Sequence, residues 1–380
     1  MLHAIRMKLR AELEAPREAR GFGTGWIAGT LALLAGATGL LLVLVLKHPG
    51  WLGVPELSLL RDHALFRPVL WAVVIAAYLL SILSLVLRPE KILGFAGMTV
   101  TLAATILGAV PGEPTNAATP GGLFLGVDFF VLNVLFMGFL FVPLERFLAL
   151  RPEQVLFREE WREDIFYYLV SSLFVQVLTF LTLAPSKAVI AVTGDWSAFR
   201  ASVGALPWLV QVVAIMVLTD FAQYWVHRAF HRVPFLWRFH AVHHSAKSMD
   251  WLASARMHFL EIIALRSLTA LPMFVLGFSE SALQAYLLIV YIYSAFIHAN
   301  IRGRFGVLEE IFVVPRFHHW HHGIEREAID VNFAIHFPLL DRLFGTHHMP
   351  ENRWPEGYGI SGHPVPKGYW AQFLYPFRKG

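Results

Sequence analysis

The chain contains no cysteine among its 380 residues. This absence excludes disulfides, thiolate-ligated haem, iron–sulfur clusters and cysteine nucleophiles. Any metal chemistry must therefore use nitrogen and oxygen ligands. The H-E-x-x-H motif of zinc proteases is also missing, in both directions, which disfavours an intramembrane zinc protease. No dinucleotide-binding unit with its glycine-rich fingerprint and no fused haem domain is recognisable, so electrons for a redox step would have to come from a partner.

Charge is scarce as well. Charged residues make up 15% of the chain and hydrophobic residues 56%, against roughly 25% charged in an ordinary soluble domain. Several apolar runs reach the roughly 20 residues that cross a bilayer as a helix. We expect an all-α, polytopic helical membrane protein with about six to eight spans. The six clearer runs are 26–46, 68–87, 92–110, 123–144, 165–184 and 207–226, and the two weaker ones are 259–278 and 283–297.

The distribution of basic residues predicts the orientation. Five basic residues precede the first apolar run, so the positive-inside rule places the N-terminus in the cytosol. Counting spans then places the basic stretches 88–91 and 146–162 on the same side, whereas the loop 111–122, which has no basic residue, falls outside. The N-terminus does not resemble a cleavable signal peptide. A bacterial inner membrane and the endoplasmic reticulum fit equally well, and the net charge of +4 gives no reason to expect a nucleic-acid partner.

Fifteen of the eighteen histidines follow residue 226, and most of them form three blocks. Histidines at positions i, i+3 and i+4 lie on one helical face, and imidazole is a common ligand of iron, zinc and copper. Eight such imidazoles are too many for one ion, so the spacing predicts a dinuclear metal site, and the span count places it on the cytosolic side. His319 directly follows His318 and should point off the ligand face. The blocks are HRAFH (His227, His231), HAVHH (His240, His243, His244) and HHWHH (His318, His319, His321, His322).

Other polar residues lie near the blocks. Asp220 precedes His227 by seven residues, or two helical turns, so its carboxylate could accept the outer N–H of a ligating imidazole. It could equally pair with Arg228 or Arg232 at the helix end. Tyr224 could support the site or belong to an interfacial aromatic belt. His258, His298 and Asn300 lie between the second and third blocks.

These motifs resemble the three histidine boxes of the fatty acid hydroxylase and sterol desaturase superfamily. The boxes are HRAFH, HAVHHS and PRFHHWHHG, and the resemblance extends to DFAQYWVHR, MDWLASARMH, FIHANIR and LLDRLFGT, covering roughly residues 123–377. One departure is Leu340, where members of the superfamily often have tryptophan.

The resemblance implies a helical membrane fold with a cytosolic cap, a non-haem di-iron centre, and O2-dependent hydroxylation or desaturation of a lipid. Relatives act on fatty acyl chains, sterols, carotenoids, alkylglycerols or amino-acid-containing lipids. The external electron donor would be a small haem protein, a ferredoxin or a reductase. By position, the implied iron ligands are the eight box histidines His227, His231, His240, His243, His244, His318, His321 and His322, joined by His298 and, from an Arg-x-His pattern, by His258. Asp220, Tyr224 and Asn300 are expected to support these ligands, with no catalytic group beyond the metal site.

We therefore expect a catalytic membrane domain over residues 123–380, preceded by a cytosolic N-terminal segment and three accessory spans within residues 1–122. A redox metal is needed in any case, because side-chain acids and bases cannot break an unactivated lipid C–H bond. We expect reduction of O2 between two irons, hydrogen abstraction from the lipid and transfer of a hydroxyl group. The alternative function is a histidine-rich transporter or binder of divalent metals. Such a transporter should have polar residues lining the middle of its spans, and few are visible in the sequence.

Overall fold

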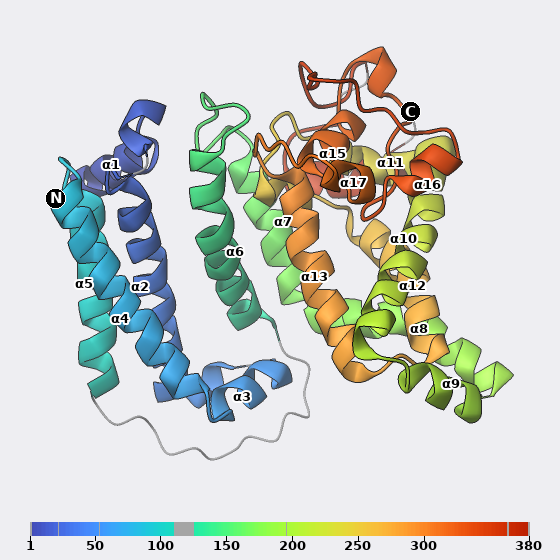
Figure 1. Ribbon diagram of the computed structural model, residues 1–380, viewed down its shortest axis with the longest axis horizontal. Helices are drawn as coiled ribbons and strands as arrows, with labels where there is room; N and C mark the ends of the chain where they lie inside the picture. Colours follow the sequence, from blue (N-terminus) through green and yellow to red (C-terminus); the bar gives the residue numbers. More distant parts are fainter. Residues whose placement is uncertain are drawn as a thin grey trace. The chain divides into compact units, whose positions relative to one another are not determined.

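The computed structural model describes residues 2–21, 23–52, 54–109, 125–194, 196–362 and 365–378. The chain divides into two compact units, Met1–Phe157 and Arg158–Gly380. Within the described residues almost all regular structure is helical (Figure 1), and the one strand-like pairing is an isolated bridge between Gly323 and Tyr358. The all-α class is confirmed.

The first unit is built around the long apolar helix α2, which packs against α4, α5 and α6. The α2, α4 and α5 interfaces are tight because small residues let the backbones come close. A Cβ added at Gly36 of α2 would lie 2.7 Å from the Thr101 hydroxyl oxygen of α5. The helices of this unit are α1 (Leu2–Leu13), η1 (Arg17–Arg20), α2 (Trp26–Lys47), η2 (Pro49–Trp51), α3 (Pro55–Asp62), α4 (Phe66–Leu87), α5 (Ile92–Ala109) and α6 (Val127–Phe147).

The membrane part of the second unit consists of four long helices that share an apolar core. Helix α10 packs on α12 and α13, and α12 also packs on α8. Val212, Ile215, Met273 and Tyr286 are buried at the centre of this core. The four helices are α8 (Val175–Thr193), α10 (Trp208–Arg232), α12 (Phe259–Leu276) and α13 (Glu280–His298).

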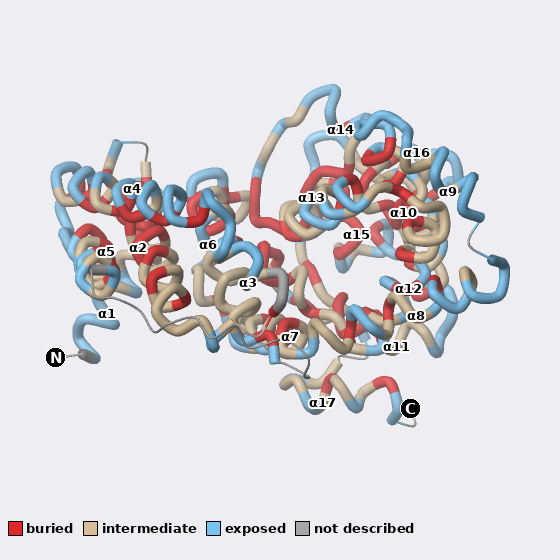
Figure 2. Tube along the Cα trace, turned by 90° about the horizontal axis from the view of Figure 1, so that it is seen from below, coloured by how far each residue is buried: buried red, intermediate tan, exposed pale blue. Residues whose placement is uncertain are grey.

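Short helices form a cap at one end of these four (Figure 1). The most deeply buried of them is α15, in which all but one residue are buried (Figure 2). Prolines begin both α11 and α15 at their first position, where a missing N–H costs nothing. A small helix, α9 (Ser197–Gly204), lies between α8 and α10 in the chain. The remaining elements are α7 (Trp161–Leu173), α11 (Pro234–His244), η3 (Trp251–Ala255), α14 (Leu308–Ile311), α15 (Pro315–His321), η4 (Arg326–Ala328), α16 (Leu339–Leu343), α17 (Tyr369–Leu374) and η5 (Tyr375–Phe377).

The expected number of spans is confirmed. Seven described helices are long and apolar enough to cross a membrane, and α5 is a shorter apolar helix. The protein is an integral membrane protein. The predicted span 165–184 was wrong in its position, because the chain breaks at Phe174 into α7 and α8. The two halves have different partners: α7 packs on η3 and α17 of the cap, and α8 packs on α12.

The domain boundary expected between residues 122 and 123 and the external loop 111–122 lie outside the described residues. Helix α6 contacts α2 and η1, and it belongs to the first compact unit.

Glycine packing in the first unit gives a test with a matched control in the same helix. A Cβ at Gly97 of α5 would lie 2.9 Å from both the Ala32 Cβ and the Ser81 hydroxyl oxygen, whereas one at Gly108 would make ordinary contacts of 3.5 and 3.6 Å with Val43. We expect Gly97→Ala to destabilise the protein by about 1–3 kcal/mol through overpacking and Gly108→Ala to be neutral or stabilising. Thermal unfolding of the detergent-purified protein measures both, and equal melting temperatures for the two variants would contradict the packing described.

Candidate metal centre

Four helix ends deliver the nine histidines of the site. His227 and His231 occupy the last two turns of α10, and His298 is the last residue of α13. The break at Val233–Pro234 turns the chain into α11, which carries His240, His243 and His244 at its own C-terminal end. Helix α15 carries the third block and ends at His321, with His322 as its cap. The three blocks and His298 therefore meet where the membrane helices enter the cap.

The nine imidazoles form two separate groups. In each group every residue offers one ligand atom, and these atoms all lie within 4.8 Å of one another. All but His231 are buried, and the His231 side chain is itself only 5% exposed. The first group is His227, His231, His240, His244 and His321, and the second group is His243, His298, His318 and His322.

Five of these imidazoles have their Nδ1 atom bonded to an acceptor outside the groups. A carbonyl can only accept, so the Nδ1 facing it must carry the proton. The neutral ring then presents its Nε2 lone pair inward, as a ligating histidine does. The bonds run from His227 to Phe333 O (2.9 Å), His321 to Val331 O (2.7 Å), His243 to Arg256 O (2.9 Å), His298 to Ser294 O (2.7 Å) and His240 to the Glu261 carboxylate (2.5 Å).

The inward nitrogens face one another at short range. His227 Nε2 lies 3.0 Å from His240 Nε2, and His298 Nε2 lies 3.2 Å from His243 Nε2. His298 and His243 each donate their outer proton to a carbonyl, so in that pair two lone pairs meet with no hydrogen between them. Such contacts are repulsive unless a cation lies between the nitrogens. The donor set therefore fits a metal ion in each group, with nitrogen ligands only.

Burial keeps the cap histidines neutral, as metal ligands must be. Loss of hydration lowers the pKa of each of them well below its usual value, and repulsion from neighbouring imidazoles adds to the effect. The cap histidines concerned are His240, His243, His244, His318, His321 and His322.

Two other histidines near the blocks belong to neither group. His258 caps the N-terminus of α12: its Nδ1 accepts from the Leu260 N–H (3.2 Å), and its Nε2 donates to Phe373 O (3.0 Å). His319, expected to point off the ligand face, bonds the Tyr358 hydroxyl through Nδ1 (2.7 Å) and Ala299 O through Nε2 (3.1 Å).

The expected supporting residues are buried near the site. The Asp220 carboxylate accepts hydrogen bonds from backbone N–H groups at 335–337, so it lies one step further from the imidazoles than its spacing suggested. Tyr224 shares a hydrogen bond of 2.9 Å with the Thr346 hydroxyl. Asn300 is 4% exposed, two residues after His298.

Sequence reasoning missed Glu261 and His336. Glu261 interrupts an apolar run, and a carboxylate inside a membrane helix is itself a signal of function; its carboxylate receives the His240 N–H. His336 is fully buried against the rings of Tyr286 and Tyr293, and it stands alone in the sequence without a histidine partner at helical spacing.

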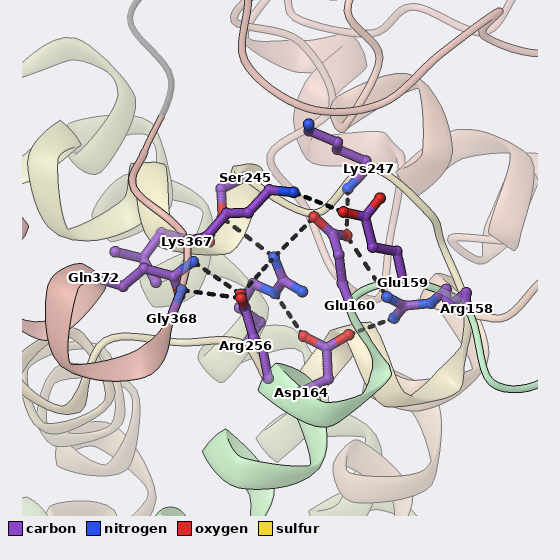
Figure 3. Close-up of polar contacts among 12 residues, drawn as sticks. Arg158, Glu159, Glu160, Asp164, Ser245, Lys247, Arg256, Lys367, Gly368 and Gln372 are labelled. Atoms are coloured by element: carbon purple, nitrogen blue, oxygen red, sulfur yellow. Dashed lines mark hydrogen bonds and ion pairs between the residues drawn. The ribbon is translucent and has the colours of Figure 1, made fainter.

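A network of buried ion pairs surrounds the Arg256 side chain (Figure 3). Arg256, whose carbonyl holds His243, pairs with Asp164 at 2.5 Å. Arg158 pairs with Asp164 as well, and with Asp250 at 2.6 Å. Removing one partner from such a network would leave a buried charge uncompensated, which is strongly unfavourable. The ion pairs therefore hold Arg256 in place, and with it the backbone carbonyl that accepts from His243.

The buried neutral histidines predict an acid-sensitive metal-free protein. Each has a folded pKa below the unfolded value of about 6.5, so below that pH the unfolded chain binds more protons. Stability is then fully present above about pH 6.5 and lost as the pH falls toward the folded pKa values. We expect the melting temperature of chelator-treated protein to fall steadily from about pH 7 to about pH 5.5. A flat profile over that interval would contradict the neutral state of these imidazoles.

Comparison with known proteins gives matches over the same part of the chain. Residues 212–346 match the family model described as fatty acid hydroxylase. An ornithine lipid hydroxylase of Rhizobium tropici is 36% identical over 46% of this chain and 53% of its own length. The alkylglycerol monooxygenase of Homo sapiens is 31% identical over 38% of this chain and 32% of its own length.

A putative methylsterol monooxygenase of Dictyostelium discoideum is 25% identical over 59% of this chain and 82% of its own length. The chain therefore spans about half of the ornithine lipid hydroxylase and a third of the alkylglycerol monooxygenase. No solved structure gives a significant match.

Proposed function

We propose that the chain, whose residues 212–346 match the fatty acid hydroxylase family model, hydroxylates a membrane lipid with O2 at two irons. One iron would be held by the first histidine group and the other by the second. The observation that carries the proposal is the division of nine buried imidazoles into two groups, each compact enough for one ion.

Iron matches both the ligands and the reaction, and it is the metal that the family resemblance implies. Imidazole nitrogens suit iron, zinc and copper, but oxidation of an unactivated C–H bond needs a redox-active ion. Bound iron would supply the reductive activation of O2. The chain's own part is to hold each imidazole neutral, with its Nδ1 proton on an outer acceptor, and to keep water from the buried site.

The proposed substrate is a lipid that carries a polar headgroup. The site lies where α10 and α13 end, so a lipid in the bilayer could reach it from the membrane side. The relatives are named for ornithine lipid, alkylglycerol and methylsterol. The ornithine lipid hydroxylase is the most similar of these three, so an amino-acid-containing lipid is the first substrate to test.

Electrons would come from an external donor on the cytosolic side. The positive-inside rule supports a cytosolic N-terminus and, with α5 counted among the six spans α2, α4, α5, α6, α8 and α10, a cytosolic cap. Exposed arginines of the cap, among them Arg232, Arg302 and Arg304, would favour docking of an acidic donor.

Lipid analysis under 18O2 tests the function directly. We expect cells that make an amino-acid-containing lipid to acquire an 18O-labelled hydroxylated lipid when they express the wild type. The label should fall to background with His244→Ala of the first group and with His322→Ala of the second, because each removes an imidazole ligand. His347→Ala, a cap histidine outside both groups, is the control and should retain the label.

An unlabelled lipid profile with the wild type, in cells shown to express it in the membrane, would contradict the proposal. Uptake of radiolabelled zinc or iron into proteoliposomes without O2 consumption would then favour the metal-transport alternative.

A further inference from the structure

An irregular segment supports the first histidine group. We call residues 331–337 the backing segment. Its carbonyls accept the outer protons of two ligands: Phe333 O from His227 Nδ1 (2.9 Å) and Val331 O from His321 Nδ1 (2.7 Å). Asn332, Phe333, Ala334 and His336 are each fully buried, although the segment belongs to no helix or sheet.

Two carboxylates take up five consecutive N–H groups of this segment. Asp220 of α10 accepts from Ile335 (2.8 Å), His336 (3.1 Å) and Phe337 (2.8 Å). Asp341 of α16 accepts from Phe333 (2.7 Å) and Ala334 (2.9 Å). Both carboxylates are fully buried. Charge-assisted hydrogen bonds of this kind are stronger than neutral ones, so they fix a backbone that has no ladder of its own.

The hydrogen bonds of Asp341 connect it to α10, the helix that carries His227 and His231. Thr346 donates to Asp341 (2.7 Å) and shares a hydrogen bond with the Tyr224 hydroxyl (2.9 Å). Tyr224 lies in α10, the helix that carries Asp220, His227 and His231. The two carboxylates, the backing segment and the ligands it supports therefore form one connected polar network.

The second group has a different support. His243 donates to Arg256 O, next to η3, and His298 donates to Ser294 O within its own helix. The Arg256 side chain pairs with Asp164, which also pairs with Arg158 (Figure 3). Arg158 pairs in turn with Asp250. Each histidine group thus has its own acceptors for the outer imidazole protons.

We propose that Asp220 and Asp341 are positioning residues for the first metal alone: through the backing segment they fix the orientation of His227 and His321. This rests on the proposed binding of one metal by each group. Loss of such outer partners commonly weakens metal affinity 10–100-fold. The effect should therefore appear at one of two sites, with the other unchanged.

The test uses the full chain in detergent, stripped of metal and titrated anaerobically with Co²⁺, whose absorption spectrum reports its ligands. Asp220→Asn and Asp341→Asn each keep the side-chain shape but turn one oxygen into a donor that faces an N–H group. We expect the wild type to bind two Co²⁺ ions. Each variant should bind one ion as the wild type does and the other 10–100-fold more weakly.

Two controls are matched to these variants. Asp128→Asn removes a carboxylate that accepts from the Phe129 N–H (2.9 Å) in the first unit, and it should leave both sites unchanged. Asp250→Asn disturbs the ion pairs that hold Arg256, whose carbonyl accepts from His243. It should weaken Co²⁺ binding at the second group, with a spectral change that differs from that of Asp220→Asn and Asp341→Asn. Thr346→Val is a milder variant with the same expected direction as Asp341→Asn, in case the latter fails to fold.

The outcomes separate the two proposals. A wild type that binds no Co²⁺ contradicts the metal-binding function itself. The positioning role is overturned if the wild type binds two Co²⁺ ions and Asp220→Asn and Asp341→Asn bind both with unchanged affinity. Equal weakening of both sites, with Thr346→Val included, also overturns it, because the carboxylates would then support the fold and not the first group.

Discussion

Repulsion between lone pairs is the constraint on which the rest of this structure depends. His243 and His298 are buried imidazoles whose outer protons are already donated to carbonyls, and they face each other through Nε2 atoms at 3.2 Å. Desolvation disfavours protonating them, so a proton cannot readily relieve the contact. A metal cation can. The helix ends, the proline breaks and the outer acceptors all serve to hold nitrogens in an arrangement that is favourable only around such a cation.

The outer acceptors explain why so much irregular backbone is buried in the cap. Phe333 and Val331 offer carbonyls to the first group, and Arg256 offers one to the second. Buried backbone without helical partners needs other hydrogen bonds, and here carboxylates and arginines provide them. This outer layer lies beyond the histidines, and its carbonyls determine which ring nitrogen carries the proton in His227, His321, His243 and His298.

Much of this was predictable from sequence, because helical spacing determines which histidines share a face. The three blocks and His298 could be singled out from spacing and family resemblance, and the all-helical class followed from apolar runs of the length of a bilayer. The resemblance to fatty acid hydroxylases is confirmed by the family match. The ligand assignment itself stays a prediction until metal is bound and observed.

The remainder depended on contacts between residues far apart in the chain. Asp220 holds backbone 115 residues away, which no local spacing reveals, and the role of Glu261 was hidden because its partner His240 lies on another helix. The break at Phe174 was missed because an apolar run does not show that its two halves pack against different partners.

Iron-edge X-ray absorption of the iron-loaded protein tests the central claim most directly. We expect a nitrogen first shell around both irons, with the outer scattering that several imidazole rings produce, and a loss of that signal in a protein lacking the box histidines. A first shell without imidazole scattering, in protein that holds two irons per chain, would contradict the metal centre described.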